Sequence, residues 1–248
     1  MAREQRSSDA LVAAGRNALA VAYFRTGDFE AVASILAQAL SRATAAGDRK
    51  AEAAAIDLQG LLLHDMAIEQ PPEERARIDS GPEHELFDRA LAIRRQIGDI
   101  EGVAESMFHL GLVYQVLRGD AAAASPYFRE ALALVEAQPD SDVLLRSEIH
   151  RHIGFDRLLR EQRHDEALAH LHTSLDLRST LDEPGWTVSG LVALAMGERL
   201  AGMRPEAIDH SRRAVELARA EGLRERHIRA AEDALRAAEA MPAGGGPG

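Results

Sequence analysis

The sequence predicts an all-α protein in which five helical hairpins stack side by side as an α-solenoid. Two observations support this fold class. Hydrophobic residues make up 46% of the 248 residues but aromatic residues only 4%, so the core must consist of Ala, Leu, Val and Ile. Such a core favours close packing of helices, because β-branched and aromatic residues are the ones that suit strands. In addition, one pattern of helix, turn and helix recurs five times along the chain.

The repeated pattern is clearest in "LAVAYFRTGDFEAVASILAQAL" (19–40) and "LGLVYQVLRGDAAAASPYFREAL" (110–132). Each segment predicts a helix with a small residue and then an aromatic residue three positions later. A Gly-Asp turn follows, and a second helix closes on Ala-Leu. Further copies occupy 153–175 and 194–215, and another is split between 59–67 and 84–91. The small residues near the ends of the second helices are 40 to 51 residues apart: Ala39, Ala90, Ala131, Ser174 and Ala214.

This pattern resembles the tetratricopeptide repeat (TPR) in its longer form, as in kinesin light chains and bacterial signalling and regulatory proteins. The resemblance extends from about Asp9 to Ala240. It implies a right-handed solenoid in which the first helix (A) and the second helix (B) of each hairpin pack antiparallel. The A helices would then line a concave groove.

Gly, Pro, Asp and Ser between the copies indicate where helices stop and start. We expect one solenoid domain over residues 1–240. Its hairpins are predicted at 9–46, 49–97, 100–137, 141–180 and 184–220. Residues 223–240 alternate charge with alanine and predict a capping helix, which the end of a solenoid requires. The Gly- and Pro-rich segment 241–248 predicts a disordered tail.

Gly111 lies within a predicted A helix, where glycine costs about 1 kcal/mol relative to alanine. The equivalent positions of the five hairpins all hold small residues: Ala20, Gly60, Gly111, Gly154 and Ala195. We therefore expect the A and B backbones to approach closely at these positions. The alternative is that flexible glycines are scattered through an alanine-rich helical protein.

An insertion at 68–83 separates the two helices of the second hairpin. Pro71, Pro72 and Pro82 prevent a continuous helix there. Long loops within compact domains are often functional. The insertion is expected to be either an ordered lid or partner contact at one edge of the groove, or an inert surface excursion.

The TPR resemblance also implies which side chains face the groove. They combine apolar groups with carboxylates, imidazoles and guanidinium groups, which suits an extended peptide or a folded partner. The predicted ligand-binding residues are Asn17, Phe24, Arg25, Asp57, His64, Asp65, Phe108, Gln115, Arg151, Phe155 and Arg199.

A pair of Glu and His residues in each of two A helices supports an alternative. The i, i+4 spacing places both side chains of a pair on one helical face. The four residues, Glu105, His109, Glu148 and His152, occupy the same positions in adjacent hairpins and could ligate Zn, Mn or Fe. The same spacing occurs in "EALAH" and "EAIDH" on predicted B helices. The A-helix pairs therefore also have a simpler interpretation, as a duplicated pair that stabilises the helix.

Composition restricts the classes of partner. A formal net charge of -11 argues against nucleic-acid binding. The sequence has no apolar run long enough to cross a membrane, no apolar secretion signal near its start and no cysteine. No catalytic residue is predicted, because no serine or threonine lies in a nucleophile-elbow motif. We expect a cytoplasmic, non-catalytic scaffold without a cofactor that binds a protein or peptide. The alternatives are a metal-dependent enzyme or small-molecule binder, and self-association as a homodimer.

Overall fold

The structure is a computed structural model that describes residues 2–138 and 140–242. All regular elements in these ranges are helices, so the predicted all-α fold class is confirmed. The predicted tail falls largely on residues 243–248, outside the described residues. The chain divides into two compact units, Met1–Pro139 (unit 1) and Asp140–Gly248 (unit 2), which we describe separately. A single solenoid over residues 1–240 therefore stays a prediction.

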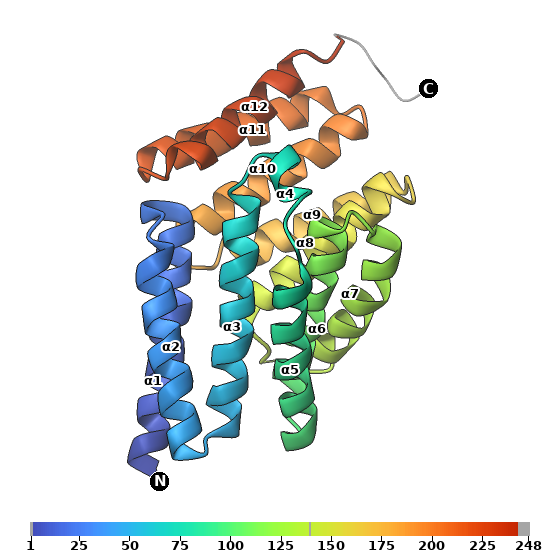
Figure 1. The fold of residues 1–248 in the computed structure, drawn as a ribbon. Helices are drawn as coiled ribbons and strands as arrows, with labels where there is room; N and C mark the ends of the chain where they lie inside the picture. The colour runs from blue at the N-terminus through green and yellow to red at the C-terminus, as the bar shows by residue number, and fades with distance from the viewer. Residues whose placement is uncertain (1, 139, 243–248) are drawn as a thin grey trace. The chain divides into compact units, whose positions relative to one another are not determined.

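Unit 1 contains three consecutive hairpins (Figure 1). The first pairs α1 (Ala2–Val21), which continues into the π-helical turn η1 (Ala22–Thr26), with α2 (Phe29–Ala46). The second pairs α3 (Arg49–Ile68) with α5 (Gly81–Ile97), and the short α4 (Pro72–Arg75) lies in the insertion between them. The third pairs α6 (Ile100–Leu112), continued by η2 (Val113–Leu117), with α7 (Ala121–Glu136). Each hairpin packs on the next through α2 with α3 and α5 with α6.

Unit 2 contains two further hairpins and a final helix. The hairpins are α8 (Val143–Leu159) with α9 (His164–Arg178), and α10 (Pro184–Leu200) with α11 (Arg204–Ala220). The final helix, α12 (Glu225–Glu239), packs against α10 and α11. Its position is the one where the sequence predicts a capping helix.

The Gly-Asp dipeptides explain where helices end and begin. Gly27, Gly47 and Gly98 adopt φ values of 75°, 65° and 71°, the left-handed conformation that ends a helix and that glycine tolerates. The aspartate that follows then caps the next helix. In the third hairpin, for example, Oδ1 of Asp120 accepts a hydrogen bond from the backbone N–H of Ala123 at 2.9 Å.

The predicted close approach of A and B helices is present at three of the glycines. A Cβ atom added to Gly111 would lie 2.4 Å from Cε1 of Phe128, far inside normal contact. The corresponding distance at Gly60 is 2.6 Å, to Cε1 of Phe87. At Gly154 the equivalent atom would lie 3.0 Å from Leu171.

The first hairpin differs from the prediction. Ala20 is only partly buried, and Gly15 makes the close approach instead. A Cβ atom on Gly15 would lie 2.5 Å from Cδ2 of Leu36, because Leu36 of α2 reaches α1 at Gly15. Ala195 in the fifth hairpin is buried, as expected.

The insertion has a defined conformation. Nη2 of Arg75 donates hydrogen bonds to the carbonyl oxygens of Ile68 and Gln70, both at 3.2 Å. Nε of Arg118, which follows η2, donates to Oγ of Ser80 at 3.0 Å. These bonds connect the insertion to the end of α3 and to the residue after η2. Its role as a lid or partner contact stays a prediction. In the described part of the chain, no helix is long and apolar enough to span a membrane.

Candidate interaction surface

In each unit, we call the surface formed by its A helices the A-helix face: α1, η1, α3, α6 and η2 in unit 1, and α8 and α10 in unit 2. Several of the predicted ligand-binding residues keep exposed or partly exposed side chains on this face. They are Asn17, Arg25, Asp65 and Gln115 in unit 1, and Arg151, Phe155 and Arg199 in unit 2. Their role in ligand binding stays a prediction.

Four other predicted ligand-binding residues are buried: Phe24, Asp57, His64 and Phe108. Phe108 packs against Phe128, with ring centroids 5.7 Å apart. Nδ1 of His64 lies 2.9 Å from Oε1 of Glu83, where the insertion joins α5. Because these side chains contact other parts of the protein, they do not line an open groove, and that expectation was wrong for them.

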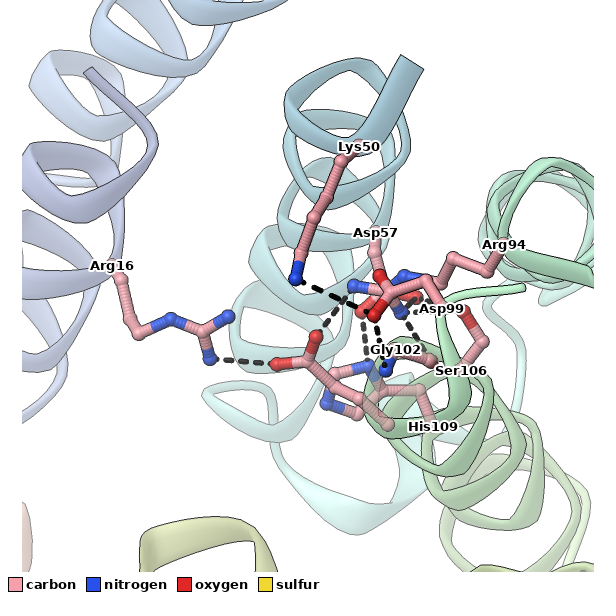
Figure 2. A network of polar contacts seen from close by, with 9 residues as sticks. Arg16, Lys50, Asp57, Arg94, Asp99, Gly102, Ser106 and His109 are labelled. Atoms are coloured by element: carbon pink, nitrogen blue, oxygen red, sulfur yellow. Dashed lines mark hydrogen bonds and ion pairs between the residues drawn. The ribbon is translucent and has the colours of Figure 1, made fainter. Parts of the chain in front are cut away.

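Asp57 of α3 lies at the centre of a buried polar network in unit 1 (Figure 2). Its Oδ1 is 3.0 Å from Nη1 of Arg94 and accepts a hydrogen bond from Oγ of Ser106 at 2.7 Å. Its Oδ2 is 2.6 Å from Nδ1 of His109. Nη1 of Arg94 also donates to the carbonyl oxygen of Gly102 at 2.9 Å. The network therefore connects α3, α5 and α6.

Glu105 extends this network to the first hairpin. Its Oε2 accepts a hydrogen bond from Nη2 of Arg94 at 2.5 Å, and its Oε1 accepts one from Nη1 of Arg16 at 2.6 Å. Burial alone would raise the pKa of Glu105, but Arg16 and Arg94 outweigh it and hold this pKa well below its usual range. Burial likewise opposes the charge of Arg94, yet Asp57 and Glu105 raise the Arg94 pKa overall. Both groups are consequently ionised.

Arg178 in unit 2 occupies the same repeat position as Arg94. Each arginine lies four residues after the small residue near the end of its B helix, Ala90 or Ser174. Arg178 is fully buried and reaches the A helix of the next hairpin, where Nη1 donates to the carbonyl oxygen of Trp186 at 3.3 Å and also to Oγ of Ser189. Its guanidinium carbon lies 5.5 Å from the centre of the Trp186 ring. A buried arginine thus joins consecutive hairpins in both units.

Glu148 in α8 is the acidic partner of Arg178. Its Oε1 accepts a hydrogen bond from Nη2 of Arg178, and its Oε2 accepts one from Nη2 of Arg151 at 3.0 Å. Burial tends to raise the pKa of Glu148, but Arg151 and Arg178, with His152, lower it to about 2. His152 is more distant, with Nε2 3.7 Å from Oε2 of Glu148.

The predicted metal ligands therefore already have protein partners. Glu105 contacts two arginines, and so does Glu148. Within residues 2–138 and 140–242, no group of three or more His, Asp or Glu side chains is arranged to hold a metal ion. The two Glu/His pairs lie in different units. Their joint metal site stays a hypothesis that no contact in either unit supports.

Ser106, Asp57 and His109 include the residue types of a catalytic triad, but their order differs. In a triad the histidine lies between serine and aspartate, so that it can accept the serine proton. Here Asp57 lies between the other two, and both contact it. This chain of contacts fixes the positions of α3 and α6 without providing an activated nucleophile.

Comparison with known proteins supports the repeat interpretation. Residues 145–220 match the family model for the tetratricopeptide repeat, a range that covers most of α8 and all of α9, α10 and α11. This part of the chain is similar to tetratricopeptide repeats. TPR arrays generally mediate protein–protein interaction. No curated protein matches the chain.

Among solved structures, the chain is similar to the crystal structure of BtubC (BKLC) from P. vanneervenii. The TM-score is 0.56 and the sequence identity 18%, and the alignment covers 89% of this chain and 91% of that one. At this identity the similarity shows the fold alone. A TPR-like arrangement of hairpins is therefore supported beyond the segment that matches the family model.

Sequence reasoning missed the two buried arginines. Their signal was present, because each lies four residues after a small B-helix residue, on the side of the helix that packs inward. Arginine is rarely buried unless it is paired. Recognising the signal would have required knowing that an acidic partner lies in a neighbouring helix.

Proposed function

We propose that the chain is a non-catalytic scaffold that binds a peptide or partner protein on its A-helix face. In this role it assembles or regulates a cytoplasmic complex. The observation that best supports the proposal is a pair of partly exposed residues on α8, Arg151 and Phe155. The guanidinium carbon of Arg151 lies 5.7 Å from the centre of the Phe155 ring. Arginine and aromatic side chains are enriched among the residues that dominate binding energy at protein interfaces.

The buried charged side chains are paired with one another, and this also supports a scaffold rather than an enzyme. General acid–base catalysis needs a group that gains and loses a proton near the working pH. Glu105 and Glu148 instead have lowered pKa values because arginines surround them. Their ion pairs join helices and hold the A-helix face in place. The accessible side chains around them mix charge with apolar surface, which suits recognition of a polypeptide.

The proposal is tested by measuring affinity for a purified partner, first identified by affinity capture from the native cell. Changing Arg151→Ala and Phe155→Ala should each weaken binding by about tenfold or more, as expected for central interface residues. Arg129→Ala and Arg212→Ala, on exposed positions of the B helices α7 and α11, should leave affinity unchanged. Thermal melting of each variant controls for misfolding. Unchanged affinity in both α8 variants would show that another surface binds the partner.

The same protein preparation discriminates between the alternatives. Stoichiometric metal that is lost in a His109→Ala, His152→Ala variant would favour the metal-dependent alternative. A metal-free preparation that still binds its partner would favour the scaffold. Self-association as a homodimer would appear in sedimentation as a doubling of mass with concentration.

A further inference from the structure

A pocket of about 560 Å³ lies in unit 1, between the second half of α3 and the insertion. Leu63, Met66 and Ala67 line it from α3, and Ile78 and Pro82 line it from the insertion. Its volume is within the usual range for ligand-binding pockets. The pocket lies apart from the buried polar network of α3, α5 and α6.

The apolar lining of the pocket is unusually accessible. Leu63, Met66 and Ile78 are 38%, 45% and 39% exposed, respectively. Leu63 and Met66 are three residues apart on α3, so they lie on one face of the helix. Large exposed apolar side chains that gather in one hollow with a polar rim are a mark of interaction sites.

The rim of the pocket is mainly acidic. Glu74 and Asp79 bring two exposed carboxylates to it, against the single guanidinium of Arg77, while the carboxylate of Glu83 is buried in the wall. Glu83 contacts His64, and Asp79 accepts a hydrogen bond from the backbone N–H of Gly81 at 2.9 Å, while Glu74 is exposed. A positively charged group of a partner would be attracted to this rim.

The walls of the pocket are already in place in the protein alone. Arg75 ties the start of the insertion to two backbone carbonyl oxygens, and Ser80 accepts the hydrogen bond from Arg118. The contact of His64 with Glu83 holds the other end against α3. A partner would therefore bind without first ordering the insertion, which reduces the entropic cost of binding.

We propose that this pocket is a second docking site, which accepts a large apolar side chain of a partner peptide that has Lys or Arg beside it. The apolar side chain would contact Leu63, Met66 and Ile78, and the basic group would lie near Glu74. One wall of this site belongs to α3 and the other to the insertion, so the site is distinct from Arg151 and Phe155 of α8, on which the proposed function rests. Either surface can bind its ligand without the other.

The probe for the test is a displayed library of short random peptides, selected against the full chain. Selected peptides should contain a large apolar residue next to Lys or Arg. Synthesised with a fluorescent label, they should bind with a clear anisotropy change. Met66→Ser and Ile78→Ser should each weaken this binding by about tenfold. Leu159→Ser, a change at a 59% exposed leucine of unit 2, is the matched control and should have no effect.

A charge exchange tests the rim. Glu74→Lys should weaken binding of the basic peptides, and replacing their Lys or Arg with Glu should restore binding to this variant. Equal binding of the selected peptides to the parent and to Met66→Ser would overturn the proposal, as would a selection without apolar-basic peptides. A dimer that disappears in Met66→Ser would place a second copy of the chain in the pocket, which also overturns it.

The two proposals fail separately. Arg151→Ala and Phe155→Ala should leave the pocket peptides bound while they weaken the partner of the A-helix face. If Arg151→Ala and Phe155→Ala leave partner binding unchanged, the A-helix face was assigned incorrectly. If Met66→Ser leaves peptide binding unchanged, the pocket was assigned incorrectly.

Discussion

Arg94 and Asp57 form a buried ion pair within the second hairpin, with Nη1 of Arg94 3.0 Å from Oδ1 of Asp57 and side chains that are 2% and 0% exposed. Removing two charges from water is costly, and the attraction between them compensates only when further hydrogen bonds complete the site. Ser106, His109 and Glu105 supply those bonds. The pair consequently depends on residues of the third hairpin.

Arg94→Ala should destabilise the protein by about 3–5 kcal/mol, because it leaves the buried carboxylates of Asp57 and Glu105 without their cation. Urea denaturation measures this difference. Arg95→Ala, at the exposed neighbouring position, is the control and should change stability by no more than about 0.5 kcal/mol. A cost below about 1 kcal/mol for Arg94→Ala would contradict the described network.

Glu148 should make the protein sensitive to acid. Its folded-state pKa of about 2 is below its ordinary value of 4.5, so its contribution to stability is fully present above pH 4.5 and is lost as the pH falls towards 2. The loss is on the order of 3 kcal/mol. The free energy of unfolding should therefore decrease less steeply between pH 5 and 2 in Glu148→Gln than in the parent. Glu130→Gln, an exposed change on α7, should keep the parental slope.

Gly111→Ala should be destabilising although alanine favours helix. The gain in helix propensity is about 1 kcal/mol. The added methyl group would lie 2.4 Å from the Phe128 ring, however, and overpacking of a core costs about 1–3 kcal/mol. We expect a lower melting temperature. If the clash is the cause, Gly111→Ala should cost less in a Phe128→Leu background, and an unchanged cost in a double-mutant cycle would refute this explanation.

Two histidines of unit 2, His150 and His210, should have pKa values on opposite sides of the usual histidine pKa. Burial, with the neighbouring His170 and Arg146, lowers the pKa of His150 to about 4. The hydrogen bond to Glu198 raises the pKa of His210. His210 should therefore stabilise the fold below pH 6.5 and lose that contribution as the pH rises through its folded pKa. NMR titration of the histidine ring protons measures both pKa values. Glu198→Gln should lower the pKa of His210 and leave that of His150 unchanged.

Helix positions could be predicted from the sequence because they depend on local signals. Gly-Asp turns and the small residues at Gly60, Gly111 and Gly154 act within one hairpin, where neighbours in sequence are neighbours in space. Ala20 shows the limit of this reasoning. Which small residue of α1 meets α2 depends on how far Leu36 extends across the interface, and repeat register alone does not determine that.

The site was predicted less well than the fold. Asp57 was expected to face a ligand, but its carboxylate forms an ion pair with Arg94, which lies 37 positions later in the sequence. Side-chain partners that lie in different helices leave no periodic pattern. The pocket next to the insertion was missed for the same reason, since Met66 and Ile78 meet only after the segment between them folds back.

The arginines near the ends of α5 and α9 also restrict how the number and order of the hairpins can change during evolution. Hairpins that contact each other only through apolar side chains can be duplicated, deleted or exchanged, because such contacts do not depend on one specific partner. Arg94 and Arg178, in contrast, each need a specific acceptor set in the following hairpin. Deleting the following hairpin would leave an ionised arginine at an apolar surface without these acceptors. The second and fourth hairpins therefore each require the hairpin that follows them.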